Sequence, residues 1–157
     1  PPKTPYKLVA NIPYYITSPI INHFLREQPP KQRPQTLTLL VQKEVAQKIC
    51  AKPGNLNVLA LQVQLFGTPK MVAKVPPSHF SPKPKVDSAI LQIEIFEKPL
   101  VSKTDELFDL IHRGFAHKRK KLIRNLGLTK EQFPFPENTR AEELSVKDWL
   151  QLLNMLS

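Results

Sequence analysis

Apolar residues in the first hundred positions recur with two periods, one typical of β-strands and one typical of helices. Four apolar or alternating runs predict β-strands, and they cover residues 6–10, 36–41, 71–75 and 86–96. Apolar residues three to four positions apart predict helices between the strands, and these cover residues 18–28, 43–52 and 56–66. This alternation predicts an α/β fold whose mostly parallel sheet carries helices on both faces.

Residues with special backbone preferences indicate where these elements begin and end. Ser18 followed by Pro19 predicts the first turn of the first helix, with Ser18 as its N-cap. Gly67 predicts the C-terminal end of the third helix. The last two strands are too close in sequence for a helical crossover, so one strand is expected to run antiparallel to its neighbours.

After the last predicted strand the pattern is helical throughout. It predicts a small all-helical domain at residues 98–157, following an α/β domain at residues 1–97. The longest helix of this second domain is expected from Lys103 to Leu126. Ser145 and Asp148 have the spacing of a capping box, which predicts the start of the final helix.

The formal net charge of +10 attracts polyanions over long distances. Nucleic acid is the first class of partner that it indicates, an anionic membrane surface is the second, and a merely solvated surface is the alternative. In the longest predicted helix, Lys118 falls on the apolar side and must reach past it to water, unless the helix bends there. Four other cations lie three to four residues apart on the opposite face and form one ridge, which favours contact with RNA phosphates; they are His117, Lys120, Lys121 and Arg124. Lys118 and Arg119 are also candidate RNA contacts.

Other features of the sequence disfavour secreted, metal-binding and membrane classes. Cys50 is the only cysteine, so internal disulfides and cysteine-rich metal sites are excluded and a reducing compartment such as the cytoplasm is favoured. The sequence contains neither a signal-peptide pattern nor an apolar run long enough to span a membrane. It begins with Pro1 rather than Met, which suggests a piece of a longer protein.

The sequence Asn11-Ile12-Pro13-Tyr14 directly follows the first predicted strand. The Asn11 side-chain oxygen and the Pro13 carbonyl are acceptors that could bind both hydrogens of an exocyclic amino group and aim its lone pair at a methyl donor. The Tyr14 ring could stack on the base that carries this amine. An ordinary turn at a strand end is the alternative interpretation of these residues.

A second motif joins the last two strands through a loop with four prolines, at residues 75–89. Prolines restrict φ and lower the entropy that a loop loses on ordering, so this loop could hold Phe80 as one wall of an aromatic slot, opposite Tyr14. Packing of Phe80 beneath the loop is the alternative. Lys83 and Lys85 in the same loop are candidate RNA contacts.

Four motifs, taken in order, resemble those of the ribosomal RNA adenine dimethyltransferases that act on the small subunit (KsgA type). They are residues 11–14, 41–46, 75–89 and 115–126, and the resemblance extends over essentially the whole chain. It implies the C-terminal half of a Rossmann-like methyltransferase sheet, mostly parallel with one antiparallel strand, followed by a small all-helical RNA-binding domain. It also implies a monomer that acts on small-subunit rRNA within a 30S ribosomal precursor.

The resemblance also assigns roles to single residues. It implies that Asn11, Pro13, Tyr14 and Phe80 hold the target adenine, which leaves its stack to enter the slot. It implies that S-adenosylmethionine is the methyl donor and that Asn11 also contacts it. The family's glycine-rich donor loop is absent from this sequence, whose four glycines form no G-x-G pattern. We therefore expect this chain by itself to be inactive.

Three alternatives remain at the level of sequence. The nearest is an erythromycin-resistance type enzyme that modifies large-subunit (23S) rRNA and shares the Asn-Ile-Pro-Tyr motif. A non-catalytic rRNA-binding assembly factor would use the basic surface alone, and would have no need for Asn11 or Phe80 at these positions. DNA adenine methylation is disfavoured, because those enzymes commonly carry an acidic residue at the first motif position.

Overall fold

The computed structural model describes residues 5–82 and 85–157, apart from the side chain of Tyr14. Its contacts divide the chain into two compact units. The first unit comprises Pro1–Cys50 and Gln62–Leu100, and the second comprises Ala51–Leu61 and Val101–Ser157. The segment at residues 51–61 therefore groups with the C-terminal part of the chain, although it lies between strands in sequence.

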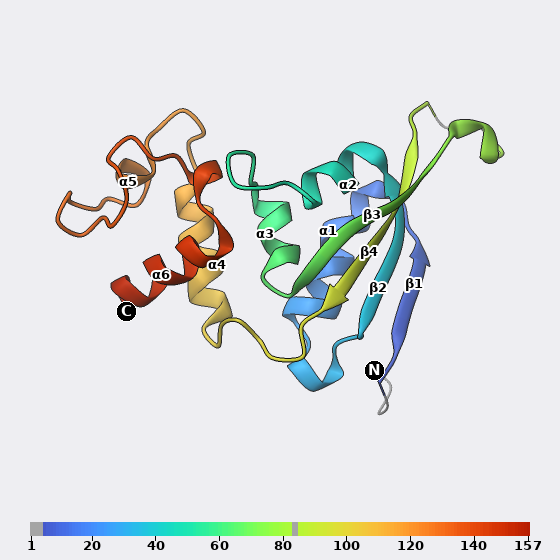
Figure 1. Ribbon diagram of the computed structural model, residues 1–157, viewed down its shortest axis with the longest axis horizontal. Coiled ribbons are helices and arrows are strands. Elements are labelled where there is room, and N and C mark those ends of the chain that lie inside the picture. The colour runs from blue at the N-terminus through green and yellow to red at the C-terminus, as the bar shows by residue number, and fades with distance from the viewer. Residues whose placement is uncertain (1–4, 83–84) are drawn as a thin grey trace. The chain divides into compact units, whose positions relative to one another are not determined.

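The first unit is built on a four-stranded mixed sheet in the order β1-β2-β4-β3 (Figure 1). β1 and β2 are parallel, whereas β4 is antiparallel to both β2 and β3. One antiparallel strand among the last two was expected, and β4 confirms it. The strands are β1 (Lys7–Asn11), β2 (Thr36–Gln42), β3 (Gly67–Val75) and β4 (Ser88–Ile95).

Short helices connect these strands. A continuous helical segment follows β1, α2 follows β2 directly, and α3 precedes β3. The last turn of α3 belongs to the first unit, where the Gln64 amide donates a hydrogen bond to the Ile49 carbonyl at 2.9 Å. The elements are η1 (Tyr14–Ile16), α1 (Thr17–Ile21), the π-helical turn η2 (Asn22–Arg26), η3 (Pro30–Gln32), α2 (Lys43–Ile49), α3 (Val58–Gln64) and η4 (Pro77–His79).

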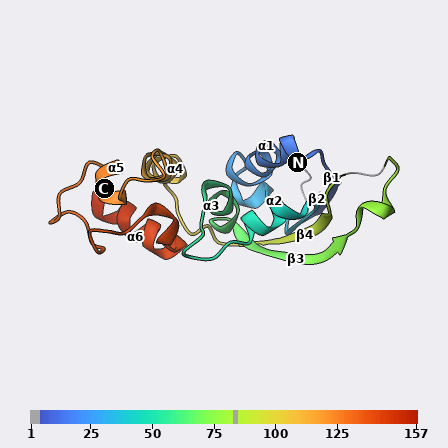
Figure 2. The same ribbon diagram turned by 90° about the horizontal axis from the view of Figure 1, so that it is seen from above.

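One face of the sheet forms the core of this unit. Leu37, Leu39, Leu91 and Ile93 are fully buried on it, and α1 and α2 lie over this face (Figure 2). On the opposite face Val9 is 76% exposed. Among the described residues of the unit, helices therefore cover one face, and the expectation of helices on both faces is wrong for this part of the chain.

Two of the expected helix boundaries are also wrong, and both for tertiary reasons. Ser18 does not cap α1; its hydroxyl donates to the Gln62 side-chain oxygen at 2.9 Å, which ties α1 to α3. Gly67 begins β3 instead of ending a helix. A Cβ at this position would overlap the carbonyl oxygen of Glu94 on β4, so glycine allows the two strands to approach.

The second unit contains α4 (Thr104–Gly114), α5 (Leu122–Asn125), η5 (Ala141–Glu143) and α6 (Val146–Leu156). Its core includes Phe108 and Trp149, both fully buried. The expected start of α6 is confirmed, because the Asp148 amide donates to the Ser145 hydroxyl at 3.1 Å and the Ser145 amide donates to the Asp148 carboxylate at 3.0 Å.

The helix predicted from Lys103 to Leu126 is interrupted. It ends at Gly114, and residues 115–121 are not helical before α5 begins. Asn125 holds the interruption, since its side-chain amide donates to the carbonyls of Gly114 at 2.8 Å and His117 at 3.1 Å. A Cβ on Gly114 would lie 2.6 Å from the Trp149 ring, so glycine at the last position of α4 leaves room for Trp149 of α6.

Candidate active site

A cavity of about 230 Å³ opens where β1 and β2 end and β4 begins. Asn11 is the last residue of β1, Gln42 the last of β2 and Ser88 the first of β4. The carboxyl ends of parallel strands are where open α/β sheets commonly bind ligands. The cavity, called the slot below, is lined by Asn11, Ile12, Leu40, Val41, Gln42, Phe80, Pro82 and Ser88.

The slot therefore brings together Asn11 and Phe80, two of the predicted site residues, from positions 69 residues apart in the sequence. Asn11 is exposed, and among the described residues its carboxamide has no hydrogen-bond partner. Its oxygen is consequently available to an amine donor. Phe80 is half-buried, so one part of its ring packs while another remains accessible.

The other two predicted site residues are Pro13 and Tyr14. Pro13 does not line the slot, and its carbonyl accepts the backbone amide of Ile16 at 3.1 Å in the turn before α1. A carbonyl oxygen has two lone pairs, so this bond leaves one acceptor site. The backbone of Tyr14 begins the 3-10 turn η1, whereas its side chain lies outside the described part of the structure.

The proline-rich loop positions Phe80 through local backbone bonds. The amide of His79 donates to the Pro76 carbonyl and the amide of Phe80 donates to the Pro77 carbonyl, both at 3.1 Å. These bonds form the turn η4 directly before the aromatic residue. Among the described residues, no cluster of His, Cys, Asp and Glu side chains could hold a metal ion.

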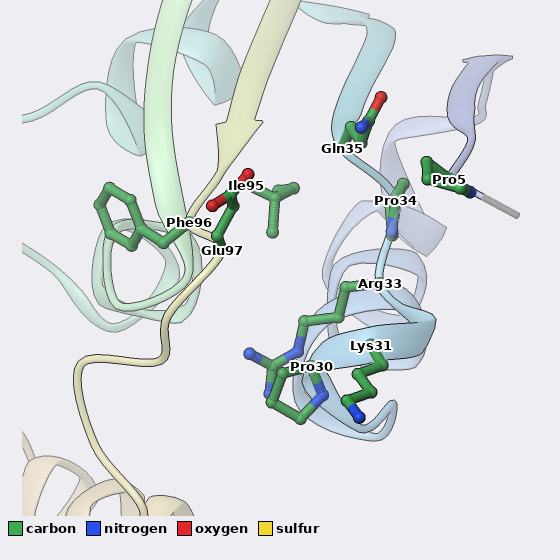
Figure 3. A pocket seen from close by; sticks show the side chains of 9 residues that line it. All are labelled: Pro5, Pro30, Lys31, Arg33, Pro34, Gln35, Ile95, Phe96 and Glu97. Atoms are coloured by element: carbon green, nitrogen blue, oxygen red, sulfur yellow. The ribbon is translucent and has the colours of Figure 1, made fainter.

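Another cavity, of about 330 Å³, lies at the opposite end of the strands (Figure 3). Its lining includes Pro5 before β1, Gln35 before β2 and Ile95 at the end of β4. Arg33 also lines this cavity. Its guanidinium lies 4.7 Å from the centre of the Phe66 ring, and its Nε donates a hydrogen bond to the Gln28 carbonyl. Burial lowers the pKa of Arg33 from its ordinary value. This cavity is separate from Asn11, which ends β1.

The model of the ribosomal RNA adenine dimethylase family matches residues 1–157. The chain belongs to this family. Ribosomal RNA small subunit methyltransferase A of Dehalococcoides mccartyi (strain CBDB1) is 40% identical over 161 residues, covering 94% of this chain and 54% of the relative. The protein of the same name from Alkaliphilus oremlandii is 37% identical, covering 96% of this chain and 57% of the relative. The chain thus spans about half the length of these relatives.

Two solved structures have a fold similar to that of this chain. A dimethyladenosine transferase from Plasmodium falciparum superposes with a TM-score of 0.79 at 28% identity, covering 94% of this chain and 66% of that one. The 23S rRNA methyltransferase ErmE superposes with a TM-score of 0.74 at 24% identity, covering 99% of this chain and 67% of that one. The ErmE likeness concerns the fold alone.

Of the cations expected on one helical ridge, His117, Lys120 and Lys121 instead lie in the interruption between α4 and α5, and only Arg124 lies on a helix. His117, Lys118, Arg119 and Lys120 are exposed in this turn, called the basic turn below. The turn closes with the amide of Lys120 donating to the His117 carbonyl at 3.0 Å. Lys121 is half-buried and Arg124 is exposed on α5, Lys85 is exposed before β4, and Lys83 lies outside the described residues.

Gln42 is the slot residue that sequence reasoning missed. It follows the apolar stretch of β2 in the way that Asn11 ends β1, and the parallel register aligns Asn11 with Leu40, near the end of β2. The signal that could have identified Gln42 was therefore its position at the carboxyl end of a strand parallel to the one that ends at Asn11. That signal requires knowing that the two strands are neighbours, which the sequence pattern alone leaves undecided.

Proposed function

We propose that this protein transfers methyl groups from S-adenosylmethionine to the exocyclic amino group of adenines in small-subunit rRNA. The observation that carries the proposal is the slot, which an exposed carboxamide and an aromatic ring from distant segments line together at the carboxyl ends of β1 and β2. Membership of the rRNA adenine dimethylase family supports it, as do relatives named small subunit methyltransferase A.

In the proposed mechanism, orientation and electrostatics activate a poor nucleophile. The lone pair of an adenine amine is delocalised into the ring, so the amine must be held with its lone pair directed at the donor. The Asn11 oxygen and the second lone pair of the Pro13 carbonyl accept the two amino hydrogens. Phe80 stacks on one face of the base and Tyr14 on the other. Release and rebinding of the once-methylated base then allow a second transfer.

The donor supplies a methyl group on a positively charged sulfonium. Asn11 is the residue of this chain that we assign to it, because its carboxamide is exposed and lacks a partner among the described residues. The glycines offer no donor loop. Gly54 and Gly127 adopt positive φ, and Gly67 and Gly114 allow close packing, so each has a structural role.

We further propose that the second unit is the small helical RNA-binding domain of the family, with the basic turn, Lys121 and Arg124 as its phosphate contacts. Lys85, which is exposed before β4, is a further proposed contact, and Lys83 is proposed as a contact from the sequence alone. The net charge of +10 and the exposure of the basic turn support this assignment. The proposed partner is the rRNA of a 30S ribosomal precursor, bound by a cytoplasmic monomer. None of the helices in the described part of the chain is long and apolar enough to span a membrane.

The proposal is tested with the full-length gene product, labelled S-adenosylmethionine, and unmethylated 30S particles and 23S rRNA as separate substrates. We expect methylated adenine in the 30S particles only. Asn11→Ala should lower kcat at least 100-fold, in the range reported for single preorganised polar groups, and leave RNA affinity within about twofold. Methylation of 23S rRNA alone would support the erythromycin-resistance type, and unchanged turnover of Asn11→Ala would refute the proposed slot.

A further inference from the structure

A third cavity, of about 360 Å³, adjoins the slot and is called the flanking cavity below. Gln42 lines both the slot and the flanking cavity, and Asp87 of the flanking cavity directly precedes Ser88 of the slot. The flanking cavity is lined by Gln42, Lys43, Glu44, Gln47, Lys85, Val86 and Asp87, all within the first unit. Its volume falls within the usual range for small-ligand sites, about 300–1,000 Å³.

The backbone holds the two sides of the flanking cavity together. β2 ends at Gln42 and α2 begins at Lys43, whose amide donates to the carbonyl of Asp87 at 3.0 Å. This bond places the segment before β4 against the first turn of α2. The walls of the flanking cavity are therefore connected to the strand ends that form the slot. The position of the flanking cavity relative to the slot is thus fixed by the backbone.

The side chains around the flanking cavity are polar and unengaged. Among the described residues, none of the six polar side chains has a hydrogen-bond or ion-pair partner. They comprise two ammonium groups, two carboxylates and two carboxamides. A bare phosphate would meet the carboxylates as well as the lysines, so the set does not suit an anion alone. A nucleotide suits it better, because its base edge offers donors and acceptors while its phosphate pairs with lysine.

We propose that the flanking cavity binds a nucleotide adjacent in the RNA chain to the target adenine, with Lys43 and Lys85 at its phosphate. Glu44, Gln47 and Asp87 face its base edge, and Gln42 separates the two bases. The inference rests on the proposed function. Adjacent nucleotides are covalently joined, so when one base enters the slot a neighbour must lie on the adjoining surface, where base-modifying enzymes read sequence context.

The experiment compares a double variant, Lys43→Gln with Lys85→Gln, to a charge-matched control, Lys98→Gln with Lys147→Gln, in the full-length gene product. Both control lysines are exposed and lie outside the slot and the flanking cavity. Methylation of a short rRNA substrate is measured from 50 to 200 mM salt. For the double variant we expect KM to rise on the order of tenfold, kcat to stay within about twofold, and the salt slope to fall by about one per phosphate-contacting lysine.

A second measurement tests reading of the base. RNAs that differ only in the nucleotides on either side of the target adenine are compared with the unmodified protein and with Asp87→Asn combined with Gln47→Ala. The unmodified protein should discriminate among bases on one side, and the variant should discriminate at least fivefold less. An unmodified protein that methylates no RNA would refute the proposed function. If the unmodified protein is active, two results would overturn the flanking-nucleotide assignment. In one the variants behave like the control, and in the other the kcat of the variants falls while their KM stays constant.

Discussion

At the scale of single residues, the packing environment decides what each side chain can do. Asn11 and Asn125 are the same amino acid, but Asn11 is exposed without a partner among the described residues, whereas Asn125 donates twice to backbone carbonyls. A free carboxamide can act on a ligand, and an engaged one stabilises the fold. We therefore assign Asn11 to substrate binding and Asn125 to structure.

Gly67 allows a close strand contact, which leads to a stability prediction. Gly67→Ala would place a methyl group against the Glu94 carbonyl and 2.9 Å from the Ile93 side chain, where both are held in the sheet. Overpacking of this kind costs about 1–3 kcal/mol. Chemical denaturation should show a loss of that size, while Thr68→Ala, at the exposed neighbouring position, should lose less than 1 kcal/mol. Equal losses would contradict the contact argument.

Cys50 provides a prediction of pH dependence. Burial raises the pKa of its thiol, and a hydrogen bond with the Met71 backbone opposes this effect only in part. The thiolate is the reactive form, so a raised pKa means less thiolate at a given pH. Alkylation by iodoacetamide should follow an apparent pKa above the ordinary value of 9.0 in the folded protein and return toward it in denaturant. A folded-state value below 9.0 would refute the prediction.

At the scale of elements, the interruption between α4 and α5 has the clearest functional consequence. An uninterrupted helix would distribute the cations of residues 117–121 around its axis, whereas the turn presents four of them on an exposed segment. The turn is held by Asn125 and by the amide of Leu122, which donates to the Thr139 carbonyl at 2.9 Å. The shape of the basic turn, and with it the arrangement of its charged groups, therefore depends on a few hydrogen bonds.

Removal of the Asn125 side chain should weaken both stability and RNA binding. Asn125→Ala loses two hydrogen bonds, each worth about 0.5–1.5 kcal/mol, so we expect a loss of about 1–3 kcal/mol in the free energy of unfolding. RNA affinity should also fall severalfold, because the basic turn becomes less ordered. Asn154→Ala, an exposed change on α6, should alter neither quantity. Retained stability in Asn125→Ala would contradict the role of these bonds.

At the scale of the whole molecule, the excess of positive charge should govern the proposed association with RNA. A net charge of +10 predicts affinity that falls steeply with salt, as counterions return to the phosphates. Most of this dependence should originate in clustered cations that contact phosphates, since dispersed cations contribute only to long-range attraction. The position of the charges therefore matters more than their number.

This distinction can be measured by changing three charges together. Lys118→Gln, Arg119→Gln and Lys120→Gln in one variant should reduce the slope of log affinity against log salt by about two to three. A second variant with Lys7→Gln, Lys98→Gln and Lys147→Gln removes the same charge from dispersed exposed positions. Its slope should change by less than one in fluorescence anisotropy titrations. Equal changes would indicate that the basic turn is only a solvated surface.

The sequence by itself determined the succession of strands and helices, the one antiparallel strand and the capped start of α6. These features depend on periodicities and spacings within a few residues. The sequence also indicated Asn11 and Phe80 as site residues. Tertiary structure alone decided that Gln42 borders Asn11, that Gly67 begins a strand against Glu94, and that Trp149 packs where the long helix ends. Each of these depends on contacts between distant segments, which local patterns do not encode.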